Sequence, residues 1–367
     1  MAQQNSTGPT ATAAAEAVTR ALELAPIVDG HNDWPWERRL GHGSSVDGLE
    51  GPLAGHTDIV RLRRGHVGAQ LWSVFVEDED RGNDAVAETL EQIDLVHRMV
   101  EAYPDDFVLA RSAADVEAAR ASGRIASLLG AEGSHSIADS PGVLRMLAAL
   151  GVRYLTLTHN RNSVWADSAT DEPVHGGLTE RGRAYIRELN RLGVLVDLSH
   201  VAPSTMHAAL DVTTSPVIFS HSSCRALNDH PRNVPDDVLA RLAGNGGVIM
   251  LTFVPQFLDT AYMEWDRDGR KGPAPRVPLS VLADHIEHAR EVAGVRHVGL
   301  GGDLDGVDAL PEGLTGADGY PALLQELALR GWDAAELAGL AGANVLRVLR
   351  ATDTAFGGVR ARTALIR

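Results

Sequence analysis

The chain has 367 residues, 44% of them hydrophobic, which is enough apolar sequence to bury one large core or two modest ones. Its formal net charge of -16 argues against nucleic acid or an anionic membrane surface as the main partner, because both require a basic face on the protein. Cys224 is the single cysteine, which excludes an intrachain disulfide and a cysteine-rich zinc site.

Taken in chain order, apolar runs of strand length alternate with amphipathic stretches of helical period. The strand candidates are residues 27–30, 70–75, 125–129, 154–158, 194–198, 217–220, 247–252 and 298–301. The helix candidates include residues 84–102, 179–192, 235–243 and 280–292, most of which begin with Asp, Thr, Ser or Pro near the first turn.

Eight strands with intervening helices predict the α/β class and a single (β/α)8 TIM barrel. Several strands are continuous Val, Ile and Leu runs, as expected when helices and barrel core cover both faces of the sheet. An open doubly wound sheet is the alternative architecture. We expect a flexible N-terminal tail over residues 1–15, the barrel over residues 16–350 and a C-terminal extension over residues 351–367.

Two connections are unusually long, residues 34–57 after the first predicted strand and residues 255–278 after the seventh. In a barrel both lie on the face where active sites form. We therefore expect each of them to act as a lid.

Metal-ligand residue types follow six of the eight predicted strands. A lone His or Asp in such a place is usually structural, as a turn or helix-capping residue. The residues are, in chain order, Asp29, His31, Asp33, Glu132, His135, His159, His200, His221, Asp303 and Asp305. Because the carboxyl ends of barrel strands surround one site, their coincidence predicts a metal centre.

The ligand types indicate which metal is bound and how many ions. Imidazole and carboxylate groups without a thiolate suit zinc, with manganese, cobalt or iron as substitutes. The number of ligands exceeds what one catalytic zinc needs and suits two ions that share a bridging carboxylate. Lys271, the only lysine, lies in a polar segment far from any strand end, so Glu132 is the expected bridge.

Three other residues resemble functional ones but have simpler explanations. His285 and His288 lie three apart on a predicted outer helix, where we expect a solvated face. Cys224 lies close to His221, but no base is assigned to it, so we expect a packing role.

Seven ordered stretches between residues 29 and 306 match motifs of a known family. They are DGHND (29–33), GAEG (130–133), YLTLTHN (154–160), VDLSH (196–200), FSHSS (219–223), RNVPDD (232–237) and GLGGDLDG (299–306). Through them the sequence resembles the renal (membrane) dipeptidase family, zinc dipeptidases with a distorted (β/α)8 barrel in the amidohydrolase-like group.

The resemblance implies a role for each matching residue. His31 and Asp33 would bind one zinc ion, His200 and His221 a second, and Glu132 with a water or hydroxide would bridge the two. The remaining roles fall to His159 at the substrate carbonyl, Arg232 at the terminal carboxylate and Asp303 at the metal-bound water.

The resemblance also implies an activity, the hydrolysis of dipeptides, including those with a C-terminal D-residue, by attack of the metal-bridging hydroxide. An amidohydrolase acting on non-peptide amides or β-lactams is the alternative enzyme. A non-catalytic relative is the third hypothesis, and it predicts a missing ligand or acid where none is missing.

One position departs from the family pattern, since Val254 stands where vertebrate members carry a carboxylate-binding tyrosine. Carboxylate binding is therefore expected to depend on Arg232 and backbone donors. Relatives are commonly dimers, so a homodimer is expected. The sequence shows no signal peptide, transmembrane segment or lipid-anchor signal, which predicts a cytoplasmic protein without a membrane anchor.

Overall fold

The computed structural model describes residues 9–79, 82–357 and 364–366. Within these ranges eight parallel strands close into a ring, which confirms the predicted barrel and excludes the open sheet. The strands are β1 (Ile27–Asn32), β2 (Val67–Ser73), β4 (Ile125–Ala131), β5 (Val152–Thr156), β6 (Leu195–Asp197), β7 (Ile218–Ser222), β8 (Val248–Leu251) and β9 (Val298–Leu300). Their order is β2-β1-β9-β8-β7-β6-β5-β4, and the pairing of β2 with β4 closes the ring.

A further short strand, β3 (Phe107–Leu109), was not predicted from the sequence. It pairs with residues 125–127 of β4, on the edge opposite β2, while β5 pairs with residues 129–131 of β4. Two strands thus share one edge of β4, which distorts the barrel.

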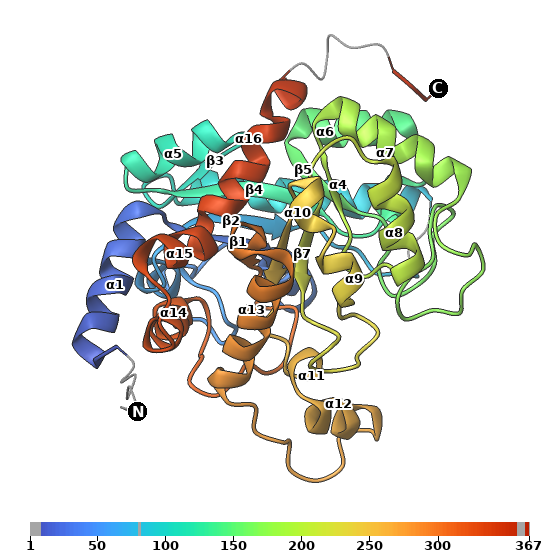
Figure 1. The fold of residues 1–367 in the computed structure, drawn as a ribbon. Helices are drawn as coiled ribbons and strands as arrows, with labels where there is room; N and C mark the ends of the chain where they lie inside the picture. The colour runs from blue at the N-terminus through green and yellow to red at the C-terminus, as the bar shows by residue number, and fades with distance from the viewer. Residues whose placement is uncertain (1–8, 80–81, 358–363, 367) are drawn as a thin grey trace.

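Helices surround this ring, as Figure 1 shows. They are α1 (Ala11–Leu24), α2 (Trp34–His42), α3 (Ile59–Arg64), α4 (Asn83–Ala102), α5 (Ala113–Ala121), α6 (Pro141–Leu150), α7 (Glu180–Leu192), α8 (Pro203–Val212), α9 (Asp236–Leu239), α10 (Leu242–Asn245), α11 (Pro255–Leu258), α12 (Thr260–Arg267), α13 (Leu279–Ala293), α14 (Tyr320–Leu329), α15 (Ala334–Ala338) and α16 (Asn344–Gly357). Among the described residues none of these helices is both long and apolar enough to cross a bilayer.

Three boundaries differ from the sequence prediction. Helix α1 begins at Ala11, before the predicted start of the barrel at residue 16, and α16 continues through residue 350 to Gly357. The helix predicted over residues 235–243 is divided into α9 and α10, because Arg241 N donates to Val238 O in a tighter, 3₁₀-type turn. Residues 1–8 of the predicted tail and most of the segment after 357 lie outside the described residues.

The interior of the barrel brings the strand ends close together. A Cβ atom on Gly301 would overlap the carbonyl oxygen of Ser220, and one on Gly30 would overlap the Met250 side chain. The glycines therefore allow β1, β7, β8 and β9 to approach more closely than larger residues permit. This packing lies directly beneath the residues that end β1, β7 and β9.

Candidate functional site

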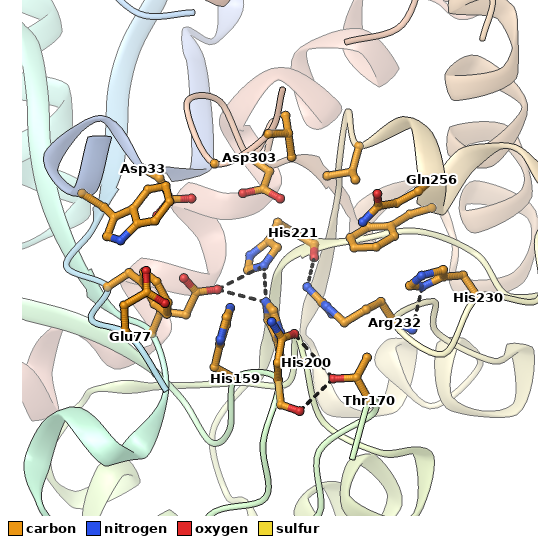
Figure 2. A pocket seen from close by; sticks show the side chains of 18 residues that line it. Asp33, Glu77, His159, Thr170, His200, His221, His230, Arg232, Gln256 and Asp303 are labelled. Carbon is orange, nitrogen blue, oxygen red and sulfur yellow. Dashed lines mark hydrogen bonds and ion pairs between the residues drawn. The ribbon is translucent and has the colours of Figure 1, made fainter. Parts of the chain in front are cut away.

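The five predicted metal ligands converge at the carboxyl end of the barrel, where Figure 2 shows most of them around one cavity. His31 is in β1 and His221 in β7, whereas Asp33, Glu132 and His200 follow β1, β4 and β6. All five side chains are buried. The barrel thus brings together residues that are far apart in the sequence.

The Glu132 carboxylate lies between two pairs of side chains. Its Oε2 is 3.4 Å from His31 Nε2, which is itself 3.4 Å from Asp33 Oδ2. Its Oε1 is 3.0 Å from His200 Nε2 and 3.3 Å from His221 Nε2. Each carboxylate oxygen therefore faces one pair, which is the arrangement a bridging ligand requires.

Hydrogen bonds within the described residues do not satisfy all the polar atoms of this cluster. His31 Nε2 and Asp33 Oδ1 are buried without a hydrogen-bond partner among the described residues. The Nε2 atoms of His200 and His221 are 2.9 Å apart and face the same oxygen of Glu132. Unpaired buried donors and acceptors are costly, and converging His and carboxylate groups fit divalent metal ions.

The electrostatics of His200, His221 and Glu132 agree with this fit, whereas Tyr154, Glu132 and Asp33 outweigh the effect of burial and raise the pKa of His31. Burial lowers the pKa of His200 and His221, so both imidazoles are neutral and can offer a lone pair. Burial alone would raise the pKa of Glu132, but His31 and the other histidines outweigh it and hold that pKa well below its ordinary value. Glu132 is therefore an anion available to bridge two cations.

Groups around the cluster fix the orientation of the rings. His31 Nδ1 is 2.7 Å from the Tyr154 hydroxyl, and His221 Nδ1 is 2.9 Å from Ser220 Oγ. Contacts of this kind to the second ring nitrogen orient a histidine ligand. Tyr154 begins a recognised motif, but the sequence did not indicate this contact.

Two buried carboxylates tie the strand ends together. Asp29 accepts hydrogen bonds from the backbone N–H groups of His31 and Gly302, which joins β1 to the end of β9. Asp197 accepts from the N–H groups of Ser199 and Ser220, which joins β6 to β7. Asp29, one of the ligand candidates, therefore has a structural role.

Two other ligand candidates also lie outside the cluster. His135 Nε2 is 2.9 Å from the carbonyl oxygen of Val76. Asp305 accepts a hydrogen bond from the backbone N–H of His56 at 2.5 Å. Both side chains thus bond to backbone groups of distant loops and not to the Glu132 cluster.

His159 and Asp303 line the same cavity, which has a volume of about 650 Å³. His159 Nδ1 is 2.8 Å from Asp78 Oδ2, and its ring centroid is 4.4 Å from that of His200. Burial and the neighbouring Asp33 carboxylate raise the pKa of Asp303 well above its ordinary value. A carboxyl group with a raised pKa is suited to proton transfer near neutral pH.

Arg232 is 2% exposed and lines the cavity on the β7 side. Its Nη2 donates to the carbonyl oxygen of His221 at 3.3 Å, but Nε and Nη1 lack a partner among the described residues. Burial lowers its pKa to about 10, so it stays charged at neutral pH. A buried guanidinium with unused donors forms a binding position for an anion.

The sequence missed several residues that shape the cavity. Asp78 and Glu77 follow β2, one of the two strands after which no ligand type was predicted. His230 and Gln256 lie beside Arg232, and Val254 lines the same cavity. Glu77 and Asp78 could have been found only from their place after a strand. Trp36 and Gln256, which also line the cavity, come from the two long connections that were predicted from the sequence.

The expectations for Cys224 and His285 can also be compared with the structure. Cys224 is fully buried and packs against α13, as expected. His285, however, is buried rather than solvated: its Nδ1 accepts from Cys224 N–H and its Nε2 is 3.0 Å from Leu258 O. Only His288 is partly exposed, paired with Asp236.

Comparisons with known proteins identify similar chains. A family model described as membrane dipeptidase (peptidase family M19) matches residues 15–362. An uncharacterized dipeptidase of Schizosaccharomyces pombe is 44% identical over 89% of this chain and 81% of its own. Dipeptidase aclJ of Aspergillus oryzae is 44% identical over 90% of this chain and 79% of its own.

A solved structure agrees with this result. A metallopeptidase of Rhodobacter sphaeroides, liganded with a phosphinate mimic of the dipeptide L-Ala-D-Ala, superposes with a TM-score of 0.80. It is 25% identical, and the match covers 89% of this chain and 99% of that one.

Proposed function

The chain belongs to the membrane dipeptidase family, peptidase family M19, and from this premise we propose that it cleaves dipeptides at the cluster around Glu132. The family makes it a hydrolase of the metallopeptidase class. Arg232 is the observation that supports a dipeptide substrate, because it offers unused N–H donors beside the cluster. In a dipeptide a free carboxylate lies one residue past the scissile bond, within reach of such a group.

We assign two zinc ions to the cluster. His31 and Asp33 would hold one ion and His200 and His221 the other, with Glu132 between them. When bound, two such ions lower the pKa of a water molecule and polarise a carbonyl group. The support for two ions is that the two oxygens of Glu132 face different pairs.

Asp303 is the proposed proton carrier. Its carboxylate is partly exposed to the cavity, and its raised pKa makes it a better base than an ordinary aspartate. Asp303 accepts a proton from the attacking water and transfers it to the amine nitrogen as the peptide C–N bond breaks.

His159 is proposed to stabilise the negative charge that develops on the carbonyl oxygen. The Asp78 carboxylate accepts from Nδ1–H and orients the ring, and Nε2 donates to the carbonyl oxygen in the imidazolium form, in which both ring nitrogens carry a proton. A donor that is already oriented stabilises the transition state without having to reorganise.

The proposed substrates include dipeptides with a D-residue at the carboxyl end. The support is the Rhodobacter sphaeroides relative, whose bound ligand mimics L-Ala-D-Ala. Gln256 and His230 lie where they can assist Arg232 in holding the carboxylate, since Val254 offers no hydroxyl.

The test compares free L,L and L,D dipeptides with their C-terminal amides, an N-acylated amide and a β-lactam, using protein of measured zinc content. We expect the wild type to hydrolyse free dipeptides and to prefer them over the amides by about a hundredfold, a preference that R232M abolishes. Hydrolysis of the N-acylated amide or the β-lactam without any dipeptide cleavage would instead support the alternative amidohydrolase.

A further inference from the structure

Four consecutive acidic residues, Glu77 to Asp80, follow β2, and the three that the structure describes have different environments. Asp78 is buried and holds His159 and the backbone N–H of Asn160. Glu79 is exposed and forms an ion pair with Arg161 at 2.8 Å. Glu77 lines the cavity, and within residues 9–79, 82–357 and 364–366 it has neither a hydrogen bond nor an ion pair. Its carboxylate is therefore available to a ligand.

The barrel places Glu77 opposite Arg232. Glu77 follows β2 and Arg232 follows β7, and these strands are four positions apart in either direction around the ring of eight. Figure 2 accordingly shows Glu77 and Arg232 on opposite sides of the cluster. The cavity thus has an anionic group on one side of the cluster and a cationic group on the other.

The surroundings of Glu77 suit a long side chain. Phe75, which packs on His159 with ring centroids 4.5 Å apart, is 6% exposed, whereas Glu77 is more exposed and two residues further along the loop. Both residues line the cavity, and Glu77 is the one that is more open to solvent. Trp36 and Phe75, whose ring centroids are 5.8 Å apart, supply aromatic surface on this wall.

In a bound dipeptide, the α-ammonium group and the side chain of the first residue would therefore reach different parts of the cavity. The α-ammonium group is attached beside the scissile carbonyl, so it must remain near the cluster. A long side chain of the first residue extends further and can reach Glu77. Methylene groups of lysine or arginine pack well on aromatic rings, and their cationic ends pair with a carboxylate.

We propose that Glu77 determines specificity by selecting dipeptides whose first residue is arginine or lysine. This inference rests on the proposed function, because a carboxylate held at Arg232 directs the first residue toward β2. It also distinguishes Glu77 from Asp78 and Glu79, whose carboxylates are already engaged by His159 and Arg161.

The experiment measures kcat/KM for Lys-Ala, Arg-Ala, Leu-Ala and Glu-Ala in the zinc-loaded wild type, E77Q, E77R and E79Q. We expect the wild type to prefer the basic dipeptides over Leu-Ala by about five- to tenfold, and E77Q to lower the ratio of kcat/KM for Lys-Ala to that for Leu-Ala to about one. E77R should favour Glu-Ala. E79Q removes the same charge from the same loop outside the cavity and should behave as the wild type.

The outcomes separate this inference from the proposed function. If no variant and no wild-type preparation cleaves any dipeptide, the proposed function fails. If the wild type cleaves Leu-Ala but the ratio of Lys-Ala to Leu-Ala is the same in E77Q, the role of Glu77 is wrong. An equal loss of the ratio in E79Q would contradict it too, since a general charge effect of the loop would then be responsible.

Discussion

Two residues of the site adopt a backbone conformation that is costly for residues other than glycine. His200 has a φ of 68° and Asp303 a φ of 58°, both in the left-handed region. Neighbouring backbone hydrogen bonds stabilise these conformations: Asp303 N–H donates to His31 O at 3.1 Å, and Ala169 N–H donates to His200 O at 2.7 Å. The strain is therefore concentrated where the side chains must point into the cavity.

The proposed role of Asp303 leads to a prediction. D303N should keep its zinc but lower kcat by about a hundredfold or more, because the amide cannot accept and return a proton. Metal content and steady-state kinetics on one dipeptide measure both effects. D308N is the control, since Asp308 is exposed and pairs with Arg270. A D303N protein with nearly full turnover would contradict the assignment.

The buried His285 makes stability depend on pH. Burial lowers the pKa of His285 from 6.5 to about 4, and Nδ1 must remain unprotonated to accept from Cys224 N–H. The stabilisation is complete above pH 6.5 and is lost as the pH falls toward 4, because the unfolded chain binds this proton first. Over this window the folded protein should lose about 3 kcal/mol through this group.

Chemical unfolding at several pH values tests this dependence. H285Q should show a smaller loss of unfolding free energy between pH 6.5 and 4 than the wild type, because glutamine does not titrate. H288Q, a change on the exposed side of the same helix, should keep the wild-type slope. Identical slopes in H285Q and the wild type would show that His285 does not control this dependence.

At the scale of the elements, close packing of the strand ends keeps the site in place. The carbonyl oxygen of Ser220, directly before His221, lies where a side chain on Gly301 would begin. Asp303 lies two residues after Gly301, so the contact between Gly301 and Ser220 sets the spacing between His221 and Asp303. Any larger residue at 301 must move β7 or β9.

This contact can be tested by adding one methyl group. G301A should lower the unfolding free energy by about 3 kcal/mol and weaken zinc binding, because the new Cβ overlaps a main-chain atom. The control G244A adds the same methyl group on α10, where nothing lies within 4 Å, and should be neutral or slightly stabilising. Denaturant unfolding and zinc titration of both variants measure the effects, and a fully stable G301A would contradict the packing argument.

The elements also show how much the sequence could predict. Each of the eight barrel strands was found, because buried runs rich in Val, Ile and Leu that alternate with helical patterns are readily recognised. The convergence of His31, Glu132, His200 and His221 could be predicted because each lies at or just after the carboxyl end of one of those strands. By contrast, the short strand β3, the partner of His159 and the burial of His285 depend on contacts between distant segments, which no local pattern reports.

At the scale of the whole molecule, the terminal helices pack on the ring that carries the site. Helix α1 packs against α14 and α15, and α16 packs against α5 and α7 (Figure 1). Segments from both ends of the chain thus cover the outside of one barrel. Because the ligands come from β1, from β7 and from the ends of β4 and β6, the site requires the closed ring and cannot form on a fragment.

Glu132 is proposed to bridge two metal ions that are both needed for dipeptide cleavage. The most direct measurement is the rate of dipeptide hydrolysis by metal-free protein as zinc is added, followed to saturation. The proposal predicts that full activity requires two zinc ions per chain and that E132Q abolishes this dependence. Full activity at one zinc ion per chain, or activity without any added metal, would contradict it.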